Sequence, residues 1–184
     1  MDADFFSEKP VEVAEKLLGC QLVRIDGNKI LKGRVVETEA YLGVEDPGSF
    51  ASGGKTDRNS LMFDTYGKFF IYLSYGVHHM LNITAGRDKV GSVLIRAVEP
   101  LEGIEYMKVN RNNESVVELS NGPGKLTQAF GIDKNYNGKS AIGGTLKIEE
   151  DDHEEPVEKS RRIGISRGKE PELRFYLRGN RFVS

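Results

Sequence analysis

Residues 33–43, Gly-Arg-Val-Val-Glu-Thr-Glu-Ala-Tyr-Leu-Gly, decide how this chain folds, because their side chains alternate between two kinds. Successive residues of a β-strand point to opposite faces of a sheet. One face of this predicted strand is apolar enough to lie against a core: Val36, Thr38, Ala40 and Leu42. The other face brings two carboxylates and a tyrosine together: Val35, Glu37, Glu39 and Tyr41. The stretch therefore predicts a strand that separates a core from a polar site.

This strand is predicted to be the return arm of a hairpin. Asp26-Gly27 is a strong turn signal, with a strand expected over residues 20–25 before it and over residues 29–42 after it. A helix precedes the hairpin: Ser7 is its predicted N-cap, Pro10 lies in its first turn, and Gly19 supplies a left-handed residue at its end.

The rest of the chain continues with short strands flanked by helices. A second hairpin is predicted from residues 69–74 and 80–84, with Tyr75-Gly76 near its tip, and another strand over residues 92–98. Pro100 is predicted to open a helix, and the turn at residues 120–124 leads into a short helix that ends near Gly131. Strands or short helices are expected at 146–148, 163–165 and 173–177. We therefore expect an α+β, mainly antiparallel fold in one domain, residues 1–184.

The charge of the chain is unevenly distributed around a formal net charge of −2. Seven acids fall within residues 149–158, which we predict to be a solvated loop, whereas residues 159–184 hold eight Lys and Arg against two Glu. A nucleic-acid footprint requires a local basic face rather than a basic total. An ordinary mixed surface is nevertheless the simpler explanation of the charges taken alone.

The composition also excludes several classes of protein. The single cysteine, Cys20, rules out a disulfide framework and indicates a reducing compartment. His78 and His79 are adjacent on a predicted strand and point to opposite faces, so no metal site is expected. The first residues are acidic, unlike a targeting signal, and no apolar run is long enough for a membrane span. We therefore expect a soluble, cytoplasmic protein. We also expect it to act as a monomer.

Glu39 is the residue most suited to catalysis. An inward-facing carboxylate on a strand requires a partner, and Arg96 on another predicted strand is the candidate. A buried Glu–Arg pair is often purely structural, and without further information that is the simpler interpretation. The alternative is a general base whose position and protonation are set by the arginine.

The aromatic residues also allow two interpretations. Tyr41, Tyr72 and Phe50 belong to a core, or they form a pocket that stacks a planar base. Tyr75, a large aromatic beside a glycine at an exposed turn, either packs onto the sheet or acts as a wedge that enters a DNA stack. Gly122-Pro123-Gly124-Lys125 is either a plain turn or a phosphate site at a helix start, although it lacks the spacing of a nucleotide-binding loop.

Taken together, these segments resemble the alkyladenine (3-methyladenine) DNA glycosylase family. No single motif is decisive, but their combination in order along nearly the whole chain is specific. The matching segments are residues 33–43, Arg58-Asn59, Met62-Phe63, Tyr72, Tyr75-Gly76, Asn82-Ile83, residues 93–97, Glu99-Pro100, residues 122–126, residues 173–176 and Val183-Ser184.

The resemblance implies a fold and a set of roles. The family fold is a single α+β domain with a curved antiparallel sheet, flanking helices and a protruding β-hairpin that inserts into damaged double-stranded DNA. By resemblance, Glu39 activates the water, Arg96 helps to place it, Tyr41 and Tyr72 sandwich the flipped purine, Asn82 disfavours guanine, and Tyr75 fills the gap in the duplex. The implied activity is base excision repair by a monofunctional glycosylase, without metal or cofactor, and Lys125 is a candidate phosphate contact.

One position departs from the family, and two rival functions stay open. Phe50 stands where the family commonly has a histidine that can hydrogen-bond the base edge, so we expect a preference for cationic methylpurines over neutral lesions. One rival is a damaged-DNA-binding module without catalysis. The other is a sugar hydrolase that uses Glu37 and Glu39 as its pair of carboxylates.

Overall fold

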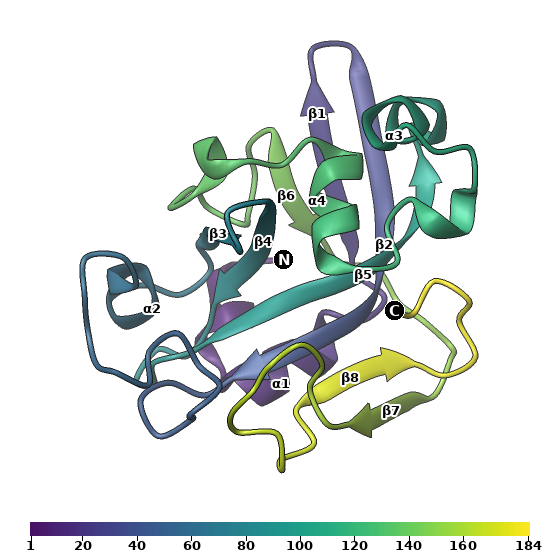
Figure 1. Ribbon diagram of the computed structural model, residues 1–184. Helices are drawn as coiled ribbons and strands as arrows, with labels where there is room; N and C mark the ends of the chain where they lie inside the picture. The colour runs from purple at the N-terminus through teal and green to yellow at the C-terminus, as the bar shows by residue number, and fades with distance from the viewer.

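The computed structural model describes residues 1–184 as a single α+β domain built on one curled sheet (Figure 1). The strand order is β3-β4-β5-β2-β1-β6, β8 also pairs with β2, β7 pairs with β8, and every pair is antiparallel. The predicted fold class is therefore confirmed. The strands are β1 (Gln21–Asp26), β2 (Lys29–Tyr41), β3 (Phe69–Ser74), β4 (His78–Thr84), β5 (Ser92–Glu102), β6 (Leu146–Glu149), β7 (Val157–Ser160) and β8 (Arg174–Leu177).

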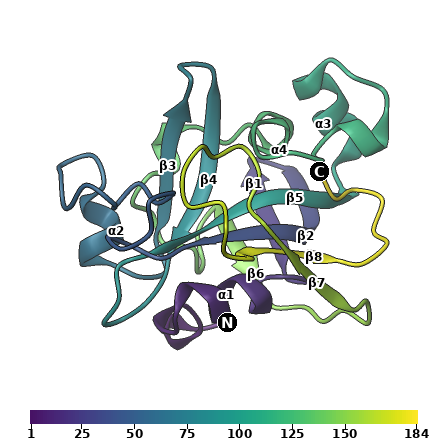
Figure 2. The ribbon, with the colours of Figure 1, turned by 60° about the horizontal axis from the view of Figure 1, so that its bottom comes forward.

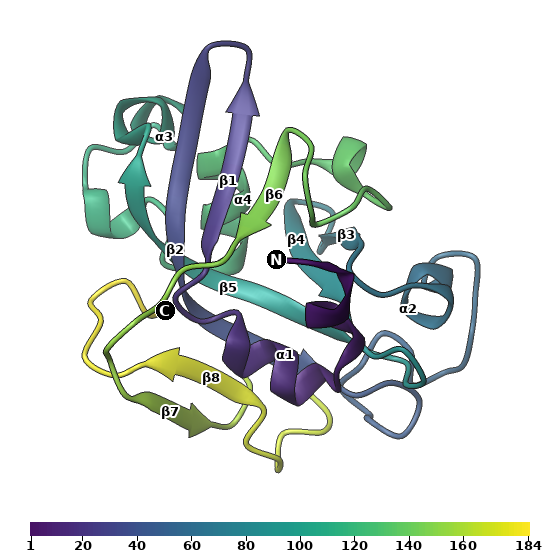
Figure 3. The ribbon, with the colours of Figure 1, turned by 180° about the vertical axis from the view of Figure 1, so that it is seen from behind.

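Short helices cover the sheet on both sides. Figures 1 and 3 show α4 and α1 on opposite sides of the long strands β2 and β5. No helix is long and apolar enough to cross a membrane. The helices are α1 (Pro10–Lys16), α2 (Ser60–Asp64), α3 (Ile104–Arg111) and α4 (Pro123–Phe130), with single 3₁₀ turns at Ala3–Ser7, Val116–Glu118 and Lys134–Tyr136.

The core lies between α1 and the apolar face of β2. Val13, Ala14 and Leu17 of α1 are fully buried in one large cluster that also contains Val36 and Ala40 of β2. Thr38 lies on the same face, and its hydroxyl donates a hydrogen bond of 2.8 Å to the carbonyl of Ala14. That bond satisfies the one polar side chain that the alternation directs into the core.

Strand β2 changes partners along its length, which brings three parts of the chain to one place. Its first half pairs with β1 through Arg34, and its second half pairs with β8 through Glu37 and Glu39. The register with β5 shifts between Val35 and Glu37, so Val35 and Val36 are both buried in the core. The strict alternation predicted from the sequence is therefore broken at Val35, and Leu42, beyond the strand end, is exposed.

Several predicted boundaries are wrong for identifiable reasons. Pro100 does not open a helix: it lies within β5 opposite Gly33, beside a register shift that accommodates its missing N–H. The helix begins at Ile104 instead, after Gly103 in a left-handed conformation.

Ser7 is not the cap of α1, because Lys9 holds that position and its N–H donates to Glu12. Residues 163–165 form a loop, and the sequence did not predict α2 or β7.

Gly103 offers a test of the β5–α3 corner. It has a φ of +76°, and a Cβ atom there would lie 2.5 Å from the carbonyl oxygen of Ile30. Gly27, at the β1–β2 turn, has a φ of +59° with nothing within 4 Å of an added Cβ. We expect Gly27→Ala to cost about 1 kcal/mol of unfolding free energy, from the left-handed conformation alone. Gly103→Ala should cost at least twice as much, as measured by urea unfolding, and equal costs would contradict this packing.

Candidate active site

A row of side chains crosses four strands on the face of the sheet away from α1. The register places Glu39 of β2 opposite Leu94 of β5, Leu94 opposite Asn82 of β4, and Asn82 opposite Phe70 of β3. Side chains two residues apart on a strand share a face, so Tyr41 and Tyr72 lie on this face as well. The sheet therefore brings together residues that are up to 55 positions apart in the sequence, from Glu39 to Leu94.

Glu39 is completely buried and has three partners. Its Oε2 accepts a hydrogen bond of 2.8 Å from the hydroxyl of Tyr41, and its Oε1 accepts one of 2.7 Å from the backbone N–H of Ile163. A guanidinium nitrogen of Arg96 lies 3.3 Å from the same Oε1. Arg96 also approaches the carbonyl of Ile163 at 3.5 Å. The carboxylate is thus fixed by its own strand, by β5 and by the loop between β7 and β8.

Burial dominates the electrostatics of Glu39. Loss of solvation raises the pKa of its carboxyl above the ordinary glutamate value, against the opposing effects of Arg96, the Ile163 N–H and the Tyr41 hydroxyl. Burial likewise raises the pKa of Tyr41 and Tyr72, so both phenols stay neutral and Tyr41 can donate to the carboxylate. A carboxylate with a raised pKa is a stronger base than a solvated one, which suits it to accept a proton.

Glu37 is a different kind of carboxylate. It accepts hydrogen bonds from Nε of Arg96 at 2.9 Å, from Nε of Arg174 at 2.6 Å, and from the backbone N–H and hydroxyl of Ser184 at 2.7 and 3.0 Å. Its lone pairs are therefore engaged by protein donors. From the sequence, Glu37 was considered only as one of the pair of carboxylates of a sugar hydrolase. Arg174 and Ser184 were named only within matching segments and without a role, because their approach to Glu37 depends on β8 pairing with β2.

A cavity of about 420 Å³ opens beside this cluster. Its lining includes three residues that touch Glu39, namely Tyr41, Arg96 and Ile163, whereas Glu39 itself lies behind them. The other lining residues come from the β3–β4 hairpin, from β5, from the end of α3, from the start of α4 and from the loop after β7. They are Tyr72, Ser74, Tyr75, His78, Met80, Leu94, Arg111, Gly122, Pro123, Gly124, Lys125, Gly164 and Ile165.

Two predicted pocket residues lie next to the cavity rather than on its wall. Phe50 packs against Tyr72, with ring centroids 4.6 Å apart, and the guanidinium carbon of Arg58 lies 5.0 Å from the Phe50 ring centre. Asn82 is buried, and its amide donates a hydrogen bond of 3.3 Å to the carbonyl of Met80. Phe50 thus supports the Tyr72 ring, and Asn82 lies in the row of side chains that begins at Glu39.

Tyr75 is the most exposed large hydrophobic residue of the chain, at 93%. It occupies the tip of the β3–β4 hairpin, which Figure 2 shows standing clear of the sheet. The turn is closed by a bond of 3.0 Å from the N–H of Val77 to the carbonyl of Ser74, and Tyr75 takes a φ of +51°. A bulky residue rarely adopts that conformation, and observed strain of this kind suggests a functional constraint. The packing alternative for Tyr75 is therefore excluded.

Charged residues around the cavity are not equally available for a ligand. Lys125 lines the cavity, but its ammonium is paired with Glu118 at 2.7 Å and with the side-chain carbonyl of Asn121 at 2.9 Å. Arg167 and Lys169 line an adjoining hollow that also contains Tyr75, and neither makes an ion pair. In the sequence these two residues stand out only as part of a basic tail, because nothing in the sequence places their loop beside the hairpin.

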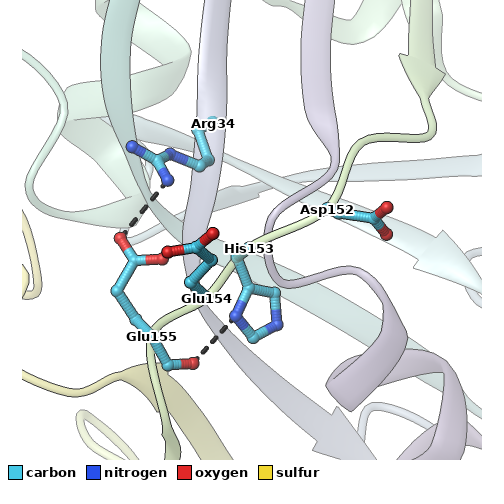
Figure 4. A pocket seen from close by; sticks show the side chains of 5 residues that line it. All are labelled: Arg34, Asp152, His153, Glu154 and Glu155. Atoms are coloured by element: carbon cyan, nitrogen blue, oxygen red, sulfur yellow. Dashed lines mark hydrogen bonds and ion pairs between the residues drawn. The ribbon is translucent and has the colours of Figure 1, made fainter.

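A separate hollow carries mostly acidic groups and no apolar side chain (Figure 4). Arg34 pairs there with Glu155 at 3.3 Å and with Glu99 at 2.9 Å, and Nδ1 of His153 lies 2.9 Å from the carbonyl of Glu155. No group of three or more His, Cys, Asp or Glu side chains is arranged to hold a metal ion anywhere in the chain.

The chain is similar to known proteins along nearly its whole length. The sequence profile of the family described as Methylpurine-DNA glycosylase (MPG) matches residues 4–181. A curated relative from Chlorobium phaeovibrioides is 42% identical over 188 residues, covering 100% of this chain and 96% of its own length. Relatives from Chlorobium phaeobacteroides and Clostridium perfringens are 44% and 42% identical, covering 98% of this chain and 94% and 97% of their own lengths. Each of the three carries the provisional name 3-methyladenine DNA glycosylase.

The two buried carboxylates should respond in opposite ways to neutralisation. Glu37→Gln leaves Arg96 and Arg174 buried without their shared counter-charge, which should cost about 3–5 kcal/mol of unfolding free energy. Glu39→Gln removes a charge that burial disfavours, since the raised pKa means that ionised Glu39 destabilises the fold at neutral pH. Thermal unfolding at pH 7 should show a large loss for the first variant and none for the second. The reverse order would contradict the assignment.

Proposed function

The chain belongs to the methylpurine-DNA glycosylase family and is a DNA glycosylase, and from this premise we propose that it hydrolyses alkylated purines from duplex DNA with Glu39 as the general base. The observation that carries the proposal is the setting of Glu39. It is a fully buried carboxylate with a raised pKa, held by two hydrogen-bond donors directly behind a cavity.

The reaction needs one water and one base. The target nucleotide first leaves the stack, at a cost of roughly a few kcal/mol that is smaller for a damaged base. Water then attacks C1′ of the sugar and passes a proton to Glu39, while the C1′–N bond breaks and its electron pair leaves with the purine. A purine alkylated on a ring nitrogen is cationic, so it departs as a neutral molecule without a general acid. The product is an abasic site.

Arg96 is the group best placed to keep this water near the carboxylate. Its guanidinium lies within 3.3 Å of Glu39 and 3.5 Å of the Ile163 carbonyl, and it lines the cavity. The three groups offer a donor and two acceptors to a water molecule, which is the number of partners that an ordered water requires. We therefore assign Arg96 the role of orienting the nucleophile.

The aromatic walls favour a cationic base. Tyr41 and Tyr72 line the cavity, and the face of an aromatic ring attracts positive charge. Asn82 is the proposed screen against guanine, because its amide can oppose an exocyclic amino group. Phe50, which lies next to the cavity and packs against Tyr72, offers no hydrogen bond to a base edge, so we expect neutral lesions to gain less than cationic methylpurines. The preferred substrates are therefore 3-methyladenine and 7-methylpurines.

The hairpin and the loop beside it form the proposed DNA interface. Tyr75 at the strained tip is the wedge that fills the space of the extruded nucleotide. Arg167 and Lys169 flank it without acidic partners and suit the phosphates of the same strand region. Lys125 must exchange Glu118 for a phosphate to take part. The wedge and the cavity belong to one chain, so a monomer suffices.

Glu39→Gln tests the catalytic assignment and the binding-module alternative together. The variant should lose base release from methylated duplex DNA by at least about a thousandfold, because no other base is placed, while its affinity for the DNA stays nearly unchanged. Release of the free purine is measured by chromatography, with Arg178→Lys as a control on a surface ion pair. A variant that keeps most of its activity contradicts the mechanism, and an inactive wild type supports the binding module. Activity on an aryl glycoside, with none on DNA, would instead support the sugar hydrolase.

Tyr75→Ala and the double change Arg167→Ala with Lys169→Ala separate two kinds of DNA contact. Loss of the wedge should weaken binding to abasic DNA more than binding to undamaged DNA, because only the gap needs filling. Loss of the two cations should weaken binding to both DNAs equally and reduce the salt dependence of the association constant. Fluorescence anisotropy over a salt series measures both effects. Equal losses for Tyr75→Ala on the two DNAs would reduce Tyr75 to a nonspecific contact.

A further inference from the structure

We propose that the buried pair of Arg162 and Asp46 is a positioning device for the catalytic carboxylate, which keeps both hydrogen-bond donors of Glu39 in place. This proposal rests on the proposed role of Glu39 as the base. Neither residue touches the cavity, and neither was singled out from the sequence, because they lie 116 positions apart and meet only through the loop after β7.

The pair itself is fully enclosed and bidentate. The two guanidinium nitrogens of Arg162 donate to the two carboxylate oxygens of Asp46 at 2.6 and 2.7 Å, and the two side chains are only 0% and 3% exposed. The same nitrogens reach the carbonyls of Ala40 at 3.0 Å and Gly168 at 2.8 Å. A buried ion pair of this kind is weak evidence for stability, so its position requires another explanation.

The first hydrogen-bond donor to Glu39, the hydroxyl of Tyr41, is positioned by stacking of the Tyr41 ring on the Arg162 guanidinium. The central carbon of Arg162 lies 4.6 Å from the ring centre of Tyr41, whose hydroxyl donates to Oε2 of Glu39. Tyr41 lines the cavity and Arg162 does not, so the arginine supports the ring from the side away from the cavity. The bond from Arg162 to the Ala40 carbonyl fixes the backbone immediately before this tyrosine.

The second hydrogen-bond donor to Glu39, the backbone N–H of Ile163, is positioned by its peptide link to Arg162. Ile163 follows Arg162 directly, and its N–H donates to Oε1 of Glu39 at 2.7 Å, although the residue belongs to a loop without regular structure. Asp46 anchors this loop to the end of β2, since it also accepts the N–H groups of Leu42 at 3.0 Å and Gly48 at 2.9 Å. Figure 2 shows the loop passing beside the β3–β4 hairpin. The pair thus controls both sides of the carboxylate.

The other charged and titratable groups that face Glu39 make no hydrogen bond or ion pair with Arg162 or Asp46. They are Arg96 on β5, Tyr72 on β3, Arg174 on β8, which lies opposite Glu39, and Glu37, which is on the same strand as Glu39. Asp46 also stays ionised during an acid titration: burial opposes its ionisation, but hydrogen bonds from Arg162, Leu42 and Gly48 outweigh burial and lower its pKa. A change in the ionisation of Glu39 therefore reports on its two donors.

The sign of the expected change distinguishes positioning from simple charge. Hydrogen bonds to a carboxylate lower its pKa, so loosened donors should raise the pKa of Glu39 further. Arg162→Lys keeps the charge and loses the bidentate, stacked geometry. Asp46→Asn removes a negative charge, which by Coulomb's law alone would lower the pKa of Glu39, opposite to the effect of loosened donors.

The experiment is single-turnover excision of 7-methylguanine from duplex DNA over a pH series, with saturating protein so that the folded fraction does not affect the rate constant. Arg162→Lys and Asp46→Asn are compared with wild type, and Arg178→Lys is the matched control at an exposed arginine–glutamate pair of 3.1 Å. We expect the acidic limb of the pH–rate profile, where the rate rises with pH, to move to higher pH by about one unit in both variants. At a given pH on that limb, the rate is then roughly tenfold lower than for wild type. The control should superimpose on wild type.

An acidic limb that stays in place, moves down, or loses rate equally at every pH would overturn the proposal and leave the pair a purely structural feature. Failure of the proposed function has a different signature. If Glu39→Gln keeps the wild-type profile, the base assignment itself is wrong. If Glu39→Gln is inactive while the limb of Arg162→Lys does not move, only the positioning proposal is wrong.

Discussion

The burial of two carboxylates on one strand is the constraint on which this structure depends. Glu37 and Glu39 are both removed from water, and a buried charge must be paired or neutralised. Arg96 contacts both carboxylates, but the fold compensates the burial of each in a different way. Glu37 is enclosed by donors from β5, β8 and the last residue of the chain, whereas Glu39 keeps a raised pKa behind an open cavity. We propose that Glu37 is thereby a structural carboxylate and Glu39 a reactive one.

The topology follows from the same requirement. Strand β2 must pair with β5 to meet Arg96 and with β8 to meet Arg174, so it lies near the centre of the sheet and exchanges β1 for β8 halfway along. The bulge near Val35 lets both of its valines enter the core just before the carboxylates begin. Loops gather at the end of β2, where Asp46 and Arg162 join two of them. Catalytic function on loops held by a rigid sheet is a common arrangement.

Local patterns in the sequence predicted the hairpins, the helix end at Gly131, the left-handed conformation of Gly19, and the side chains that share a face with Glu39, because these features depend on neighbouring residues. The first helix ends earlier than predicted, at Lys16. Features that depend on contacts between distant residues could not be predicted from these local patterns. Pro100 was assigned to a helix start because its pairing with Gly33 is nonlocal. Ile163 was expected in a strand or helix, although its N–H is used by Glu39 rather than by a ladder. The resemblance to a known family supplied candidate roles, but not Arg162, Asp46, Arg167 or Lys169.

The central claim is that one buried carboxylate acts as the only proton acceptor, and the pH dependence of wild-type excision tests it most directly. The substrate is a duplex that contains 7-methylguanine, whose cationic base needs no acid to leave, measured under single-turnover conditions. The account predicts a rate that rises tenfold per pH unit, levels off at a midpoint above the ordinary glutamate range, and then stays constant. A rate that is independent of pH in this range, or that falls as the pH rises through it, would contradict the account.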